Sequence, residues 1–349
     1  MLQCLTVAIR PLRVEELAEI LEFDFGEAGG ATPTLNKDWR WDDRQRAVLS
    51  TCSSLITLVD DCRSRVIHFS QFSVKEFLTS HRLATPQGDF SHFYILSEPA
   101  HTTLAQACLG TLLLLDDVLK VCLAESSLPL AKYASQHWVE HAQFVMASTR
   151  IEDGMRRLFD LAKLYFNAWF GLHNIDNGWN QFKEKYNAGR GSPLYYSSFC
   201  GFSDLEAHII AEHPEQVNAS GGLNYSPLVA ALHKRHFDIA ELLHWRGAAV
   251  DVSGCYYQTP LIAASVDGLI DVARWLLDRG TDANSQQFCD QTPFICAAAN
   301  GHLELVRILL GHGACITTAS FRCSTPLHLA SGDGGEAIAA TWSGYQRTG

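Results

Sequence analysis

The chain is 349 residues long, which exceeds the size of one compact core, so we expect two or three domains. Charged residues make up 19% of it and apolar residues 47%, a composition typical of globular rather than disordered chains. The formal net charge of −11 argues against a nucleic-acid-binding protein, which normally has a basic face, and the 11 cysteines, without a Cys-x-x-Cys pair, favour a reducing, cytoplasmic compartment without disulfides.

Residues 1–90 predict a small domain of two helices, a hairpin and a third helix. Residues 2–9 are apolar and helix-like, and the helix after Pro11 has a buried face of Val14, Leu17, Ile20 and Leu21. Two short apolar runs, 54–59 and 66–69, flank a polar turn. A helix with serines available to cap it then covers residues 70–78. This order of elements predicts a winged-helix-like domain.

Residues 91–190 predict a helical segment and a linker. The longest apolar run, 112–115, is broken by Asp116 and Asp117 and is too short to cross a bilayer, so we expect no membrane insertion. Residues 174–191 are rich in Asn and Gly and form a candidate hinge. Before them, a helix has an apolar face that we expect to dock on the repeats that follow; the face comprises Met155, Leu158, Phe159, Ala162, Leu164, Tyr165 and Trp169.

Four stretches of this region carry a family resemblance. "LQCLTVAIRPLRVEELAEIL" and "VIHFSQFSVKEFL" resemble the winged-helix segment that follows the NACHT nucleotide-binding module in fungal NOD-like proteins. "LSEPAHTTLAQACLGTLLLLDD" and "PLAKYASQHWVEHAQF" resemble the helical segment that these proteins place before their repeats. The resemblance implies the C-terminal part of a NOD-like (STAND) signalling or immune-type protein.

The nucleotide-binding module of that family is missing from the sequence. The module carries a Gly-x-x-x-x-Gly-Lys-Ser/Thr loop that holds phosphates, and no Gly-Lys dipeptide occurs here. The resemblance also implies a phosphate-binding histidine in a His-x-Ser-x-x-Glu-Phe segment, where this chain has Gln71, with His68 three residues earlier. We therefore expect no ATPase and no cofactor. The abrupt start and the irregular end of the sequence suggest a fragment of a larger protein.

Residues 191–349 contain a repeat with a period near 33 residues. A Ser/Thr-Pro-Leu/Phe step recurs with its proline at positions 193, 227, 260, 293 and 326, at intervals of 34, 33, 33 and 33 residues. Each hydroxyl is expected to cap a helix that begins at the proline. Eight residues after the proline stands Gly201, Gly268 or Gly301, with Arg235 in the second unit. Glycines at 247, 280 and 313 follow leucine-rich helices, where the chain often needs a positive φ.

This pattern, with its core Thr325-Pro326-Leu327-His328, resembles the ankyrin repeat. The resemblance implies stacked helix pairs that bind other proteins on a concave surface and have no catalytic activity. The fold expected for the whole chain is mainly α, an ankyrin-repeat solenoid preceded by a winged-helix-like domain and a helical segment. We expect four units and a partial, degenerate fifth after Ala330.

The sequence also contains features of two other classes of function. Residues 137–141, His-Trp-Val-Glu-His, match the His-x-x-Glu-His pattern of zinc peptidases, in which two histidines on one helix face bind the metal. The alternative, which we favour, is an amphipathic helix without metal, with Tyr133, Trp138 and Phe144 packed inward. A nucleic-acid binder acting through the winged helix would need a basic recognition helix, and the candidate has only Lys75, His81 and Arg82.

The expected partner-binding residues lie at the hairpin tips, just before each Ser/Thr-Pro step. None of these tips has the glycine of the usual Asp-Gly turn, and tyrosine and arginine dominate interface hot spots. Tyr256 and Tyr257 form the centre of the expected surface, although one of them could instead pack on a neighbouring unit. The full set of predicted contact residues is Leu223, Tyr225, Tyr256, Tyr257, Asp290 and Arg322.

Overall fold

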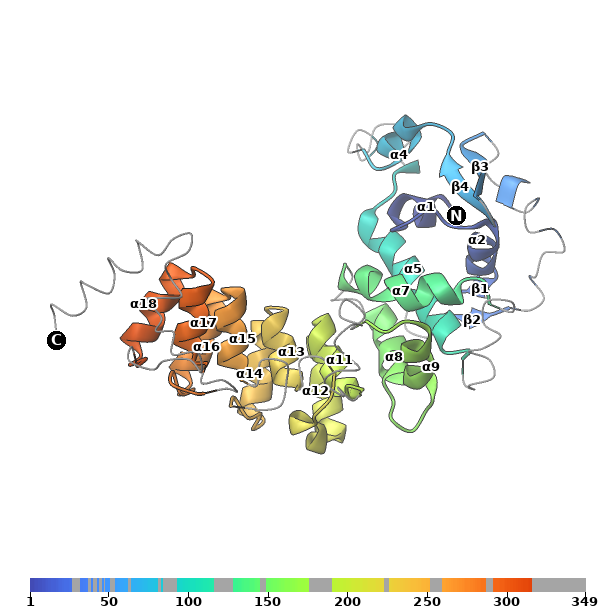
Figure 1. The fold of residues 1–349 in the computed structure, drawn as a ribbon. Helices are drawn as coiled ribbons and strands as arrows, with labels where there is room; N and C mark the ends of the chain where they lie inside the picture. Colours follow the sequence, from blue (N-terminus) through green and yellow to red (C-terminus); the bar gives the residue numbers. More distant parts are fainter. Residues whose placement is uncertain are drawn as a thin grey trace. The chain divides into compact units, whose positions relative to one another are not determined.

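The computed structural model is mainly helical and divides into two compact units, Met1–Asn177 and Gly178–Gly349 (Figure 1). No helix among the described residues is long and apolar enough to cross a membrane. The predicted boundary near residue 90, within the first unit, stays a prediction. The structure describes residues 1–26, 32–36, 39, 43, 46, 48–50, 54–61, 64–80, 83, 93–115, 128–144, 149–175, 190–222, 226–251, 259–286 and 291–315.

The first unit begins with the elements expected from its sequence. Two helices precede an antiparallel hairpin, in which Ile56 pairs with Phe69, and a third helix follows. A second, very short antiparallel pair joins residues 23–24 to residues 34–35. The elements are α1 (Leu2–Val7), α2 (Val14–Leu21), β1 (Phe23–Asp24), β2 (Thr34–Leu35), β3 (Ile56–Asp61), β4 (Ser64–Phe69) and α4 (Phe72–Leu78).

The expected serine cap of α4 is wrong. The residue that precedes the helix is Gln71, whose side chain makes no capping hydrogen bond. Ser70 lies one position too early and donates its hydroxyl to the carbonyl of Ser54 on the other side of the hairpin (3.3 Å). The start of α4 is therefore held by the hairpin rather than by a side-chain cap, and the winged-helix arrangement of these elements stays a prediction.

Helix α2 shows how an acidic side chain can fix a helix start. The Glu16 carboxylate accepts hydrogen bonds from the backbone N–H of Arg13 (2.8 Å) and from the guanidinium of Arg10 (2.6 and 2.9 Å), although Glu16 itself is fully buried. A glutamate at the third helical position satisfies a backbone donor that the helix leaves free. The apolar face of the helix consists of Val14, Leu17, Ala18 and Ile20, all buried, whereas Leu21 is only half-buried.

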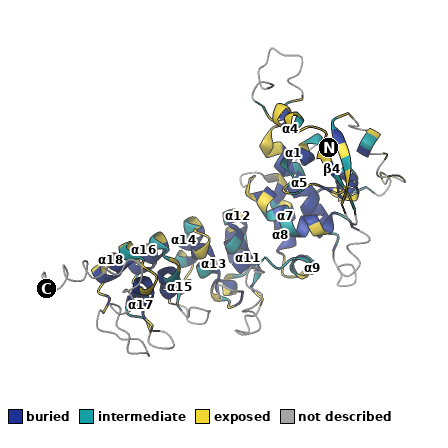
Figure 2. Cartoon of the chain, turned by 45° about the horizontal axis from the view of Figure 1, so that its top comes forward, coloured by how far each residue is buried: buried dark blue, intermediate teal, exposed yellow. Residues whose placement is uncertain are grey.

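The centre of the first unit is a packed group of longer helices. They are α5 (Ser97–Leu112), α7 (Ala131–Gln143), α8 (Thr149–Leu158) and α9 (Tyr165–Leu172), and most residues of α5 are buried (Figure 2). Trp138, Phe159, Phe166 and Trp169 form an aromatic cluster, in which the two indoles meet edge to face with ring centroids 5.3 Å apart. The expected linker face is only partly buried, and Phe159 and Trp169 contact Trp138 of α7 in their own unit. Met155, Leu158, Phe159 and Trp169 are buried, Tyr165 is half-buried, and Ala162 and Leu164 are exposed.

The second unit is a series of helix pairs. The first helices of successive pairs pack side by side, as α11 does with α13 and α15 with α17, and so do the second helices, α12 with α14 and α16 with α18 (Figure 1). A short 3₁₀ helix, η4 (Pro214–Asn218), follows the first pair. The pairs are α11 (Pro193–Cys200) with α12 (Ser203–Glu212), α13 (Pro227–His233) with α14 (Phe237–Trp245), α15 (Pro260–Asp267) with α16 (Ile270–Asp278), and α17 (Pro293–Ala299) with α18 (Leu303–Gly311).

The predicted helix caps are confirmed in all four pairs. The hydroxyl that precedes each proline accepts a hydrogen bond from the backbone N–H three residues later, at 3.2–3.3 Å, and the proline is the first helical residue. Proline fits there because its missing N–H has no partner in the first turn. The capping residues are Ser192, Ser226, Thr259 and Thr292.

The turn between the two helices of a pair is left-handed, as the glycine period predicts. At Gly268 φ is +67°, and a Cβ there would lie 2.6 Å from the ring of His302, so two constraints exclude a side chain. Arg235 occupies the corresponding position of the second pair and keeps a φ of +61°, although it has a side chain. The repeat geometry thus overrides the backbone preference of arginine.

Candidate functional site

All six predicted contact residues lie outside the part of the chain that the structure describes. They are Leu223, Tyr225, Tyr256, Tyr257, Asp290 and Arg322. The helix-capping residues that follow three of these tips in the sequence, Ser226, Thr259 and Thr292, are described. The expected degenerate fifth unit after Ala330 also lies outside the described residues. The tips as a binding surface therefore stay a prediction.

Two asparagines join successive units through hydrogen bonds to the following loop. The amide nitrogen of Asn218 donates to the carbonyl of Gly247 (3.0 Å), and its oxygen accepts from the N–H of Ala249 (2.9 Å). Asn284 makes the same pair of bonds to Gly313 (3.0 Å) and Cys315 (2.6 Å). We call this arrangement the Asn clamp. It fixes the loop of one unit against the loop of the next.

Sequence reasoning missed the Asn clamp, although the period contains its signal. Residues 218, 251 and 284 are spaced by 33, and in each clamp the bonded residues follow the asparagine by 29 and 31 positions. The middle of these three positions is Asp251, which has a carboxylate where Asn218 and Asn284 have a side-chain amide. Burial raises the pKa of Asp251, and the nearby charge of Asp282 raises it further.

A polar cluster on the second helices also joins two units. Glu241 on α14 accepts a hydrogen bond from the indole N–H of Trp275 on α16 (3.0 Å) and pairs with the guanidinium of Arg279. That guanidinium lies 3.9 Å from the centroid of the Trp275 ring. The hydrogen bond from Arg279 is the main reason that the pKa of Glu241 is lowered. Nearby on α14, Trp245 is 82% exposed, a large aromatic surface that the sequence analysis did not identify.

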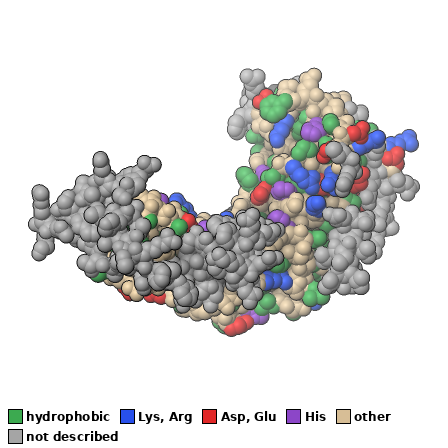
Figure 3. Space-filling model, viewed as in Figure 1, with side chains coloured by type: hydrophobic (Ala, Val, Ile, Leu, Met, Phe, Trp, Pro, Cys, Tyr) green, Lys and Arg blue, Asp and Glu red, His purple; other side chains and the backbone are tan. Residues whose placement is uncertain are grey.

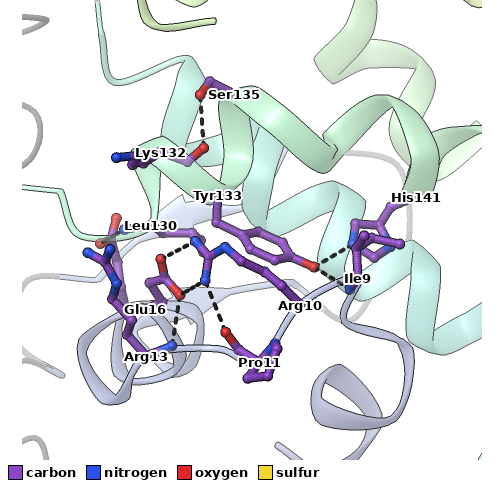
Figure 4. A network of polar contacts seen from close by, with 11 residues as sticks. Ile9, Arg10, Pro11, Arg13, Glu16, Leu130, Lys132, Tyr133, Ser135 and His141 are labelled. Carbon is purple, nitrogen blue, oxygen red and sulfur yellow. Dashed lines mark hydrogen bonds and ion pairs between the residues drawn. The ribbon is translucent and has the colours of Figure 1, made fainter. Parts of the chain in front are cut away.

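The His-x-x-Glu-His motif lies on α7, but its second histidine is part of a hydrogen-bond network. His141 is fully buried, and its Nε2 lies 2.8 Å from the hydroxyl of Tyr133 (Figure 4). Its Nδ1 lies 2.8 Å from Nδ1 of His101 on α5. The backbone N–H of Ile9 donates to the same tyrosine hydroxyl (3.2 Å), and the Arg10 guanidinium lies 5.0 Å from the centroid of its ring. The network connects the segment after α1 to both α5 and α7.

This geometry gives the motif a structural role. The pKa of His141 is lowered to about 3, mainly by burial and to a smaller extent by the charges of His101 and His137. Both ring nitrogens are occupied by protein groups, and the described residues contain no cluster of three or more His, Cys, Asp or Glu side chains suited to a metal ion. The zinc-hydrolase alternative thus has no support from the described geometry.

The inward packing expected for this helix holds for two of its three aromatic residues. Tyr133 and Trp138 are fully buried. Phe144 is 63% exposed, so its predicted position in the core is wrong. It follows the last residue of α7 and stacks on the ring of His101, with centroids 4.0 Å apart.

The nucleic-acid alternative depends on a basic helix that the structure does not show. Lys75 lies on α4, whereas His81 and Arg82 lie outside the described residues. On the face drawn in Figure 3, basic and acidic side chains of the first unit are interspersed. Gln71 is the residue before α4, and His68 lies on β4 opposite Thr57. Neither alternative is supported by a described group of residues.

The comparison with known families agrees with the repeat geometry. Residues 261–310 match the family model described as ankyrin repeats (many copies). The match covers α15 to α18, and the two preceding helix pairs have the same caps and left-handed turns. No curated protein matches the chain. Residues 261–310 are therefore ankyrin repeats, and the two described helix pairs before them share their local geometry.

Proposed function

We propose that the chain is a non-catalytic scaffold whose ankyrin array binds a protein partner. The match of residues 261–310 to the ankyrin family carries this proposal, because ankyrin repeats generally mediate protein–protein interaction. The partner is expected on the concave surface formed by the first helices and the hairpin tips, with Tyr256 and Tyr257 at its centre. A cytoplasmic location is part of the same proposal.

The finer part of the proposal concerns the first unit. The resemblance of residues 1–190 to the winged helix and helical segment of fungal NACHT proteins suggests a signalling protein, in which the array recognises a ligand and the first unit transmits its binding. The order of helices, hairpin and helix in residues 2–78 supports this proposal. It requires no nucleotide chemistry from this chain.

The binding surface is tested by a pair of variants of the full chain. Tyr256→Ala combined with Tyr257→Ala is compared with Trp245→Ala, which removes an exposed aromatic ring from α14, away from the tips. Affinity for a partner captured by the wild type is expected to fall by at least tenfold in the tyrosine double variant and to stay unchanged in the tryptophan variant.

Melting temperature separates a lost interface from lost packing. An unchanged melting temperature in the double tyrosine variant, together with lost capture, supports the proposed tip surface. A lowered melting temperature with capture retained in the cold means that the tyrosines pack on a neighbouring unit. Loss of capture only in the Trp245 variant would move the binding surface to the second helices.

A further inference from the structure

The first ankyrin pair contains a carboxyl group where the other pairs are apolar. Glu206 on α12 is 0% exposed. It lies 13 positions after its proline, and the same position in the next three pairs holds Ala240, Ala273 and Val306, all buried. A glutamate at this core position requires hydrogen-bond partners or a proton, because burial of an isolated carboxylate is very unfavourable.

The hydrogen bonds around Glu206 indicate whether it is an ionised carboxylate or a protonated carboxyl group. The hydroxyl oxygen of Ser198 on α11 lies 2.7 Å from the carbonyl of Leu194 and 2.8 Å from Oε1 of Glu206. A serine has one hydroxyl proton, so it can donate to only one of the two oxygens. If the serine proton goes to one of these two oxygens, the second contact is a hydrogen bond only if the group on its far side supplies the proton. A carbonyl has no proton to supply, whereas a protonated carboxyl group has one.

The third ankyrin pair shows the direction of the serine bond. Ser265 stands at the position of Ser198 and donates to the carbonyl of Leu261, four residues earlier, at the same distance of 2.7 Å. If Ser198 likewise donates to Leu194, then Glu206 must donate its own proton to Ser198. The geometry is therefore that of a neutral carboxylic acid at the start of a short chain of hydrogen bonds.

The surroundings of the carboxyl group favour the same state. Oε2 of Glu206 is buried and has no hydrogen-bond partner among the described residues. Burial is the main cause that raises the pKa of Glu206 to about 8, with a smaller contribution from the negative charge of Asp238 and opposition from the hydroxyls of Ser198 and Ser197.

Among the described residues, the charge that acts on Glu206 is that of Asp238, which is negative. Helix α11 contributes hydroxyl groups, those of Ser197, Ser198, Tyr195 and Tyr196. Helix α14 contributes Asp238, Glu241 and His244, and is preceded by His236, whose pKa is lowered by burial. The 3₁₀ helix η4 contributes the exposed Glu215 and is preceded by His213. On α12 itself the titratable neighbours are Asp204, His208 and Glu212.

We propose that Glu206 is a proton-dependent switch in the first ankyrin pair, in which the neutral acid holds α12 against α11 and loss of its proton in mildly alkaline solution opens the pair. The unfolded or opened chain ionises this carboxyl near 4.5, the folded chain near 8. The stabilising contribution is thus complete below pH 4.5 and decreases as the pH rises to 8. Opening of the pair should increase about tenfold between pH 7 and pH 9.

Hydrogen exchange on the full chain tests the switch. Protection factors of amides in residues 193–212, corrected for the intrinsic effect of pH, are expected to fall about tenfold between pH 7 and pH 9 in the wild type. Glu206→Gln keeps a buried donor to Ser198 but cannot ionise, so its protection should not change over this range. The matched control is Glu212→Gln, an exposed glutamate on the same helix, which should behave as the wild type.

A direct measurement keeps the proposal testable if Glu206→Gln folds poorly. The infrared difference spectrum between wild type and Glu206→Ala, which has the side chain of two other pairs, should contain a protonated carboxyl band at pH 6.5 that is lost at pH 9.5. An ionised Glu206 at pH 6.5 would overturn the proposal. So would equal pH dependence of protection in the wild type and in Glu206→Gln.

Discussion

At the scale of single residues, the first unit depends on a histidine that stays neutral. His141 connects Tyr133 to His101 through both of its ring nitrogens, and Tyr133 in turn accepts the N–H of Ile9. A tyrosine hydroxyl that accepts the N–H of Ile9 is free to donate to His141, which then donates from Nδ1 to His101. Protonation of His101 at Nδ1 would place two donors against each other and break this connection.

The first prediction concerns the acid stability of this unit. The pKa of His141 is about 3 in the folded chain and near 6.5 in the unfolded chain, so only the unfolded chain binds a proton between these values. Its contribution to stability is complete above pH 6.5 and is lost as the pH falls. Between pH 7.5 and pH 5, we expect the first unit to lose about 1–2 kcal/mol from this group.

Hydrogen exchange in α5 and α7 measures this loss. In His141→Gln, which cannot be protonated, the decrease between pH 7.5 and pH 5 should be smaller than in the wild type. His208→Gln, on α12 of the other unit, is the control and should keep the wild-type decrease. An equal decrease in all three proteins would assign the acid sensitivity to other groups.

At the scale of the elements, the Asn clamp leads to the second prediction. Asp251 stands where Asn218 and Asn284 stand in their units, and a carboxylate cannot donate to the carbonyl 29 residues later, at Gly280. Asp251→Asn supplies that donor and removes the repulsion from Asp282. We expect the array to gain about 0.5–1.5 kcal/mol at pH 7.

Chemical denaturation at two pH values measures this gain. The difference between Asp251→Asn and the wild type should be larger at pH 7 than at pH 3.5, where the carboxyl becomes protonated. Asp267→Asn, at an exposed aspartate that ends α15, should leave stability unchanged. A gain of equal size from Asp267→Asn would indicate a general effect of net charge instead of a completed clamp.

The third prediction concerns the core between helix pairs. Leu276 on α16 is fully buried, so Leu276→Ala should cost roughly 2–5 kcal/mol. Protection should fall first in α15 to α18, because repeats couple mainly to their neighbours. The half-buried Leu242 on α14 is the control, and its change to alanine should cost less. A uniform loss of protection over both compact units would contradict nearest-neighbour coupling.

The period allowed the helix pairs to be predicted, whereas the contacts of the first unit were not predictable. Caps and left-handed turns depend on residues within one pair, so their pattern is visible in the sequence, even where Arg235 replaces glycine. The bond from Ile9 to Tyr133 joins residues 124 positions apart, and that from His101 to His141 joins residues 40 apart. Such partners follow from packing and leave no period in the sequence.

Part of the candidate site could also have been found from the sequence. When the pairs are aligned, Glu206 is equivalent to Ala240, Ala273 and Val306, an apolar core position. Asp251 is equivalent to two asparagines, Asn218 and Asn284. Both differences are visible once each column is compared between units. The exposure of Trp245 was not predictable, because its neighbours on α14, Leu243 and His244, are buried and half-buried and the helical pattern does not separate them.

At the scale of the whole molecule, the fourth prediction concerns nucleotides. The sequence has no Gly-Lys dipeptide and therefore no phosphate-binding loop of the NACHT type. We expect the purified full chain neither to bind nor to hydrolyse ATP. Fluorescent ATP and ADP should show no saturable binding at concentrations up to about 100 µM, which is 100 times a micromolar Kd. Micromolar binding, competed by unlabelled nucleotide, would contradict this expectation.

The Asn clamp also restricts how such an array can change its length during evolution. Removal of residues 227–259, one full period, would join Ser226 to Pro260 and bring Asn218 to the same spacing of 29 and 31 positions from Gly280 and Asp282 that it now has from Gly247 and Ala249. A deletion that is not a whole number of periods would separate the amide from both of its bonding positions. Gene rearrangements that add or remove whole modules therefore preserve these bonds, and they can vary the recognition surface without a redesign of the joints between units.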